Sequence, residues 1–415
     1  MTSIRPSPCP SIPNSTSRAC PLEALNVDCL IAILSSTNTL ADLSAFIRAS
    51  PAALASFFAT KASILLSVLT NELGPAVRDA LVLSCTEDLD SLAAGSIEQT
   101  FEIAIACFRE CLLRDSSPWV STQDVHTASA MARLARTALS FADLYIRQQR
   151  HIFTHFLTPP GGTWSASLTE RRRIAQAFLR FRVITGLYNP AFHDAGMDGY
   201  FTTHLAHLFK GWELEQISAL ADFVDDLIES YARLDKNPPP LPRDRYRYYG
   251  DYYHALYFYN LPAFHGRLCE AQREDGLFLG KLVAARGRGA GLRSCRLTMG
   301  PVEAWRRGTA TSRLGGDAVV ETEFFEGDRE SVGPPWAWVY TWNGGMVKRW
   351  GEELVPRCRA GCYLEEHHRV AVLGERWRFL GMVFWDRDRV EELLKAEELE
   401  GCRGGWLWSR LDQGL

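Results

Sequence analysis

Apolar positions recur with helical spacing from residue 20 to about residue 235. The clearest stripe comprises Leu214, Ile217, Leu220, Ala221, Val224, Leu227, Ile228, Tyr231 and Leu234. Intervals of three and four residues place these side chains on one helix face, which we expect to be buried. Prolines at 238–240 cannot continue a helix, so this one should end before Asn237. The pattern predicts a mainly α-helical chain up to this point.

Two more helices are predicted in the same part of the chain. One carries the stripe Val125, Ala128, Ala132, Ala135, Leu139, Ala142 and Tyr145, whose small residues would let another helix approach closely. The other begins at Ser167, because Glu170 follows at capping-box spacing. Arg171–Arg173, Arg180 and Arg182 give this helix a basic face. We expect a solvated face, with an acidic partner or RNA as the alternative.

The composition changes after the Pro-rich stretch 237–242. Seven of the 13 tyrosines lie between Tyr246 and Tyr259, and nine of the 12 tryptophans lie beyond position 300. Strands are predicted at Val319–Val320, Phe324–Phe325, Trp336–Trp342 and Arg378–Trp385. Asn343-Gly344-Gly345 is typical of a hairpin turn, and a helix should start near Asp388. The C-terminal part is therefore predicted to be smaller, Trp-rich and α+β.

Charge and cysteine usage narrow the function classes. The 415 residues carry 45 basic and 49 acidic side chains, a net charge of −4, which argues against a protein that coats nucleic acid or anionic membrane. No apolar run approaches the ~20 residues of a membrane span. Most of the 11 cysteines stand singly in apolar stretches, which favours a reducing compartment, cytoplasmic or nuclear. Residues 1–19 lack a signal-peptide core and are expected to be a disordered tail.

The first helical residues have a distinctive pattern. Asn26 can cap a helix, Asp28 then lies in its first turn, and Leu30, Ile33 and Leu34 form an apolar face. A second short helix carries Leu40, Leu43, Phe46 and Ile47, and a third starts at Pro51.

These residues resemble the F-box, a three-helix module that opens with Leu-Pro-x-Glu-Ile/Leu. Leu25, Val27, Asp28, Ile33 and Leu34 carry the match; asparagine at 26 replaces the motif's proline, and aspartate at 28 its glutamate. The run 45–51 is similar to one in F-box-like proteins of filamentous fungi, which often end in a segment similar to 380–386.

The resemblance implies a substrate-receptor subunit of a cullin-type ubiquitin ligase. The box would bind a Skp-family adaptor, which joins the cullin scaffold, while the C-terminal region would hold an unknown protein substrate. The implied partner-binding residues are Leu25, Val27, Leu30, Ile33, Leu34 and Leu43. The alternative is that these residues are simply core. The expected parts are a tail at 1–19, an F-box-like module at 20–60, a helical domain at 61–235, a Pro-rich linker or loop at 236–250, and the α+β region at 251–415.

Other candidate sites give weaker signals. Cys358, Cys362, His367 and His368 could bind zinc, but no spacer separates two ligand pairs. His204 and His207 share a helix face and could join His193, Asp194 or Asp198 at a metal, although packing is the better interpretation. Gly287–Gly291 fits a basic loop rather than a phosphate-binding loop. The Tyr246–Tyr259 run fits a core edge, or else a protein-binding surface.

Binding is therefore preferred over catalysis. The chain has no Gly-x-Ser-x-Gly motif and no kinase motif set, and we expect no cofactor, no metal, no membrane and no nucleic acid as a partner. The alternatives are an interaction protein that works without a ligase, or an enzyme with His204 or His193 in a pocket between the helical and C-terminal parts.

Overall fold

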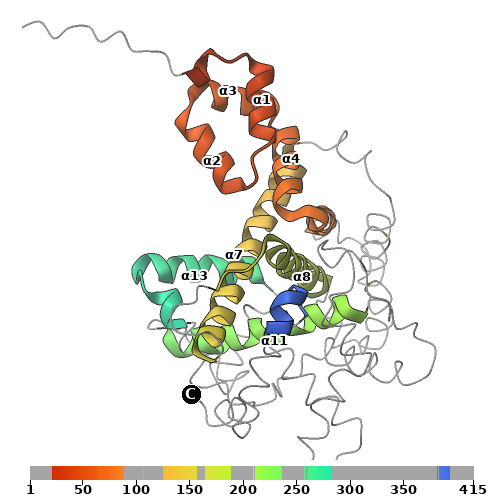
Figure 1. Cartoon of the computed structure of the whole chain (residues 1–415), viewed down its shortest axis with the longest axis vertical. Helices are drawn as coiled ribbons and strands as arrows, with labels where there is room; N and C mark the ends of the chain where they lie inside the picture. The colour runs from red at the N-terminus through yellow and green to blue at the C-terminus, as the bar shows by residue number, and fades with distance from the viewer. Residues whose placement is uncertain are drawn as a thin grey trace, which may run out of the picture. The chain divides into compact units, whose positions relative to one another are not determined.

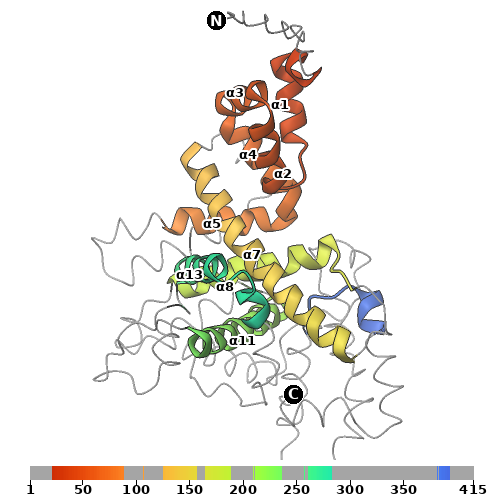
Figure 2. The same cartoon turned by 90° about the vertical axis from the view of Figure 1, so that its left-hand side faces the viewer.

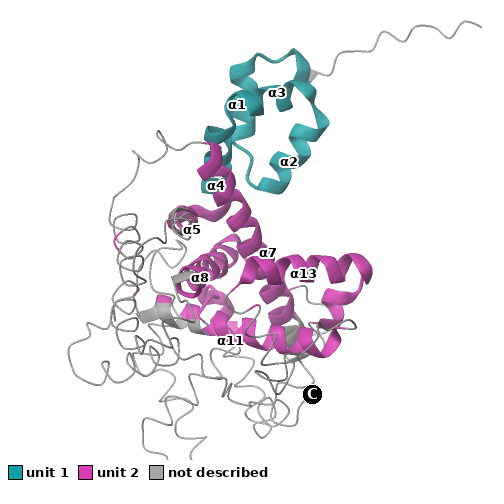
Figure 3. Cartoon of the chain, turned by 180° about the vertical axis from the view of Figure 1, so that it is seen from behind, with its two compact units in different colours: residues 1–71 teal, residues 72–415 magenta. Residues whose placement is uncertain are grey.

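The computed structural model describes residues 21–87, 106, 125–156, 164–187, 209, 211–235, 257, 260–282, 381 and 383–392. Its regular elements in these ranges are helices, so the mainly α prediction is confirmed for this part of the chain. The chain divides into two compact units, Met1–Asn71 (unit 1) and Glu72–Leu415 (unit 2) (Figure 3). The predicted strands and hairpin at 319–345 lie outside the described residues.

Unit 1 is built from short, individually capped helices. They are η1 (Pro21–Ala24), α1 (Val27–Ser35), α2 (Leu40–Ala49), α3 (Pro51–Ala59) and the first part of α4 (Lys61–Leu73). Asn26 caps α1 as expected, accepting a hydrogen bond from the Cys29 N–H (2.8 Å). Thr39 and Ser50 cap α2 and α3 in the same way. The three predicted helices are therefore present.

The core of unit 1 lies where α1 and α2 pack on α3. Its buried apolar side chains include Leu30, Leu34, Leu43, Ala53 and Phe57. The α4 residue Asn71 donates from Nδ2 to the backbone oxygens of Ser35 and Thr37, both at 3.0 Å. These bonds satisfy carbonyls that the end of α1 leaves without helical partners.

Unit 2 is organised around one central helix. Its elements are η2 (Gly74–Ala76), α5 (Val77–Glu87), α7 (Val125–Phe156), α8 (Leu168–Leu187), α11 (Gly211–Leu234) and α13 (Leu261–Glu274). Helices α5, α7 and α11 all pack against α8, and α13 packs on α7 (Figures 1 and 2). Because neighbours surround α8, residues 173–181 are buried on every side of it.

Both predicted apolar stripes of unit 2 are largely buried. On α11, Ile217, Leu220 and Val224 belong to the core, and the helix ends at Leu234, before the prolines. On α7, Ala128 to Tyr145 follow the predicted face, whereas Val125 at its start is exposed. None of the described helices alone is long and apolar enough to cross a membrane; only α3 with residues 61–84, a bent pair, passes by length and composition.

The prediction of a strand at 378–385 is wrong for the described residues 381 and 383–385, which form a turn. Gly381 has φ +64°, and its carbonyl accepts a hydrogen bond from the Phe384 N–H (2.9 Å). A positive φ is easily adopted by glycine and interrupts an extended strand. The helix expected near Asp388 is present at 387–392.

Candidate functional site

The six implied partner-binding residues of unit 1 do not share one environment. Leu30, Leu34 and Leu43 are almost fully buried in the core between α1, α2 and α3. Ile33 is partly buried. Leu25 and Val27 are exposed, Val27 to 55%. Leu25, Val27 and the accessible part of Ile33 can meet a partner without opening the unit, whereas Leu30, Leu34 and Leu43 cannot.

Unit 1 also exposes apolar side chains on α3. Phe58 is 67% exposed, in ring contact with the buried Phe57 (centroids 5.8 Å apart), and Leu54 is exposed on the same helix. Helix α3 packs on both η1 and α1. Leu25 directly follows η1, and Val27 is the first residue of α1. We call Leu25, Val27, Leu54 and Phe58 the exposed apolar set. Exposed apolar side chains mark a protein-binding surface where they form one contiguous patch.

In unit 2, the predicted capping box at the start of α8 is present. The Ser167 N–H donates to Glu170 Oε2 (2.8 Å), and the Glu170 N–H donates to Ser167 Oγ (3.1 Å). The Glu170 side chain also accepts from the Asp386 N–H (2.9 Å) and from two nitrogens of Arg389 (2.6 and 2.9 Å). A fully buried carboxylate thus joins α8 to a segment more than 200 residues away.

A second ion pair, between Arg173 and Asp386, also links α8 to this distant segment. Arg173, one turn further along α8, donates from Nη1 to Asp386 Oδ1 (2.9 Å), and Ser167 Oγ donates to Asp386 Oδ2 (2.6 Å). From α11, Gln216 donates to the Val383 carbonyl (2.9 Å). We call residues 381–392 with these partners the C-terminal clasp. Its blue ribbon lies beside the start of α8 (Figures 1 and 2).

Aromatic packing completes the C-terminal clasp. The buried Trp385 ring makes an edge contact with Trp164 (centroids 5.4 Å apart) and lies against Tyr145 of α7 (6.2 Å). The Arg389 guanidinium lies over the Trp164 ring, 4.6 Å from its centroid. Val383, Phe384 and Trp385 therefore form part of the core of unit 2. They belong to the segment 380–386, on which part of the predicted resemblance to fungal F-box-like proteins rests.

The expectation of a solvated basic face on α8 is wrong for Arg173 and Arg180, which are buried. Arg180 forms ion pairs with Asp79 (3.0 Å) and Glu213 (2.9 Å), bringing together α5, α8 and α11. Burial by itself would lower the pKa of Arg180, but the two carboxylates outweigh it and raise that pKa. These arginines stabilise contacts between helices and are not available to RNA.

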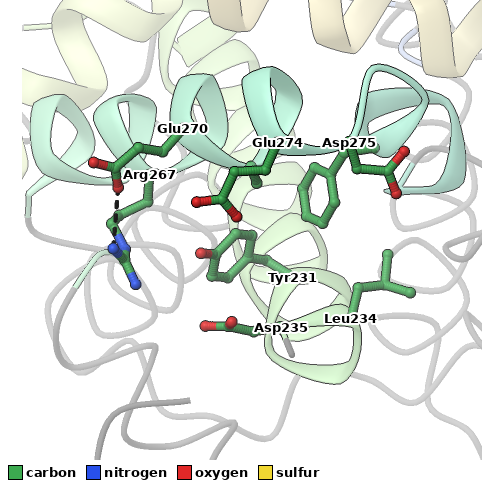
Figure 4. Close-up of a pocket in the computed structure, with 9 residues that line it drawn as sticks. Tyr231, Leu234, Asp235, Arg267, Glu270, Glu274 and Asp275 are labelled. Carbon is green, nitrogen blue, oxygen red and sulfur yellow. Dashed lines mark hydrogen bonds and ion pairs between the residues drawn. The ribbon is translucent and has the colours of Figure 1, made fainter. Parts of the chain in front are cut away.

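A pocket of about 210 Å³ lies between the end of α11 and α13 (Figure 4). Its lining residues are Tyr231, Leu234, Asp235, Arg267, Glu270, Ala271, Glu274, Asp275 and Phe278. The rings of Tyr231 and Phe278, with centroids 5.8 Å apart, give the pocket an aromatic wall. Tyr257 (6.2 Å) and Phe264 (5.6 Å) also contact the Tyr231 ring but do not line the pocket. We call this the α11–α13 pocket.

The charged side chains that line the α11–α13 pocket are mostly acidic. Arg267 Nη1 pairs with Glu270 Oε2 at 3.0 Å, and the other carboxylates of the lining are Asp235, Glu274 and Asp275. Burial, together with the charge of Asp235, raises the pKa of the Tyr231 hydroxyl to about 12. The phenol therefore stays protonated to a higher pH than an ordinary tyrosine, whose pKa is 10.

Sequence reasoning did not identify the α11–α13 pocket. The missed signal was the start of α13: Asn260 caps this helix by accepting from the Ala263 N–H (3.2 Å), and Pro262 lies in its first turn. Recognising that helix would have aligned Arg267, Glu270 and Glu274 along it.

Several predicted sites lie outside the described residues. They are Cys358, Cys362, His367 and His368; His193, Asp194, Asp198, His204 and His207; and Gly287–Gly291. Of the Tyr246–Tyr259 run only Tyr257 is described, and it is buried against Phe264 (5.2 Å). Within the ranges that the structure does describe, no three or more His, Cys, Asp or Glu residues are grouped so as to hold a metal ion.

Compared with known proteins, the chain matches no family model, no curated protein and no solved structure. The N-terminal resemblance therefore stays a prediction.

Proposed function

We propose that this chain is an F-box-like receptor whose unit 1 binds a Skp-family adaptor of a cullin-type ubiquitin ligase. Unit 2 would then carry the surface that holds a protein substrate. The observation that supports this is the exposed apolar set. These side chains stay in solvent although unit 1 has a core of other, buried apolar residues. The motif match at Leu25 and Val27 falls on the same exposed positions.

Burial separates the motif residues that form the core of unit 1 from those that could contact the adaptor. Leu30, Leu34 and Leu43 fill the interior where α1 and α2 meet α3, so they would keep the box folded. Val27 and Phe58 keep most of their surface in solvent, so they would be covered by the adaptor. Fully burying a large apolar side chain contributes about 1.5–3 kcal/mol, and Val27 and Phe58 have only about half and two thirds of their surface left to bury. Together they would contribute about 2 kcal/mol, enough to change affinity at least about tenfold.

The test is adaptor recovery by a variant that changes only the exposed positions. We expect full-length chain purified from its native host to bring down the Skp-family adaptor and cullin, detected by mass spectrometry. Val27→Asp with Phe58→Asp should reduce adaptor recovery at least tenfold while leaving the circular dichroism spectrum unchanged. Leu34→Asp is unsuitable by itself, because a charge in this buried position would unfold unit 1.

A control introduces one aspartate at an exposed leucine of unit 2. Leu277 is 72% exposed, so Leu277→Asp should retain the adaptor. Absence of the adaptor from the wild-type purification would refute the proposal, as would equal recovery by the double variant. Specific recovery of other proteins without adaptor or cullin would instead support an interaction protein that works without a ligase.

A further inference from the structure

We propose that the α11–α13 pocket binds a basic side chain, lysine or arginine, presented by a segment of a partner protein. The pocket belongs entirely to unit 2, so its ligand class is independent of what unit 1 binds.

The pocket has the two surfaces that such a side chain requires. Apolar atoms of Tyr231, Leu234, Ala271 and Phe278 line it, and carboxylates surround them. Lysine and arginine combine an apolar stem with a charged head, so the stem can lie on the first surface while the head meets the second. Aromatic rings add attraction for a cation within about 6 Å of their centroids.

The distribution of charge favours a cation over an anion. Four carboxylates and one guanidinium line the pocket, a net charge of −3. Arg267 is already paired with Glu270, and Lys281 Nζ pairs with Asp275 (2.5 Å) from outside the lining. The Glu274 carboxylate makes no ion pair or hydrogen bond with other residues that the structure describes. Figure 4 shows the Glu274 and Asp235 carboxylates on either side of Tyr231, with the Arg267–Glu270 pair on the side of the pocket toward which both extend.

An exposed leucine beside the pocket points to a protein segment rather than a small free cation. Leu277 lies between the lining residues Asp275 and Phe278 and is 72% exposed. A residue that follows the basic one in a peptide could pack on this side chain. A free amine would make no use of it. Charge complementarity and the neighbouring apolar contact together define the partner as a segment with a basic residue next to an apolar one.

The experiment measures binding of a short peptide by fluorescence anisotropy. The probe is fluorescein-labelled Gly-Ser-Arg-Leu-Ser-Gly, titrated with the full-length chain at low and at physiological salt. We expect saturable binding that weakens with salt. Glu274→Gln should weaken it about fivefold, and Glu274→Gln with Asp235→Asn about tenfold. Leu277→Ser should also weaken binding of this peptide.

Three controls decide the outcome. Glu229 of α11 is exposed and does not line the pocket, so Glu229→Gln removes one charge elsewhere and should leave binding unchanged. A peptide with glutamine in place of arginine should not bind. Butylguanidine should compete only at much higher concentration than the peptide. Equal weakening by Glu229→Gln, equal binding of the glutamine peptide, equal competition by butylguanidine, or no binding at all would each overturn the proposal.

Discussion

Glu170 offers the sharpest test of how the C-terminal clasp is held. Its oxygen Oε2 accepts from the Ser167 N–H and from Arg389 Nη2, and Oε1 accepts from the Asp386 N–H and from Arg389 Nε. Glu170→Gln keeps the shape but turns one of these oxygens into an NH₂ group that faces two donors. It also leaves Arg389 without its charge partner.

The expected cost follows from burial. The Glu170 side chain is fully buried and that of Arg389 is 17% exposed. Removing one partner of a buried ion pair costs about 3–5 kcal/mol, and we take the lower end, about 3 kcal/mol, because Arg389 can reach some water. The matched control is Glu391→Gln, since Glu391 pairs with Arg387 (2.8 Å) in the same short helix, and the side chains of this pair are 32% and 59% exposed. That change should cost about 1 kcal/mol at most.

Amide hydrogen exchange measures how often residues 381–392 detach from the rest of unit 2. The Asp386 amide is protected by Glu170, and its exchange rate rises with the population of the open clasp. A loss of about 3 kcal/mol corresponds to about 100-fold faster exchange of peptides covering 381–392, against about fivefold or less for Glu391→Gln. If both variants accelerated exchange to the same extent, the buried pairs would not be what holds the segment.

Two further outcomes follow from the structure of unit 2. Gly381→Ala should destabilise unit 2 by about 2 kcal/mol or more in urea unfolding, because φ is +64° and a Cβ would lie 2.3 Å from the Tyr145 hydroxyl. Tyr145→Phe in that background should recover part of the loss, and simple additivity of the two changes would contradict the predicted clash. Burial, and then the charge of Arg136, lowers the pKa of His265 below its usual 6.5. The unfolded chain therefore takes up a proton first, so stability should fall as pH drops below 6.5; His265→Asn should flatten that dependence, and an unchanged pH profile would argue against it.

Features that depend on nearby residues could be predicted from the sequence, and features that depend on distant residues could not. The C-terminal end and the buried face of α11 could be predicted because a long apolar stripe and a following proline run act locally. The capping box of α8 was equally local, since Ser167 and Glu170 are three residues apart. The burial of Arg173 and Arg180 could not be predicted, because their partners Asp386 and Asp79 are far away in sequence. The turn at Gly381 was missed because an apolar run predicts a strand regardless of one glycine.

The sequence by itself determined the helical periodicities, the caps and the sites where helices must stop, because these depend on neighbours within one or two turns. It also determined a near-neutral overall charge and the motif resemblance at the first helix. Only the tertiary structure decided which members of that motif are core and which are exposed. It also decided which arginines lie in buried ion pairs, and that Tyr231 and Glu274 face one pocket. These features depend on side chains brought together from distant parts of the chain, and spacing along the sequence carries no information about such encounters.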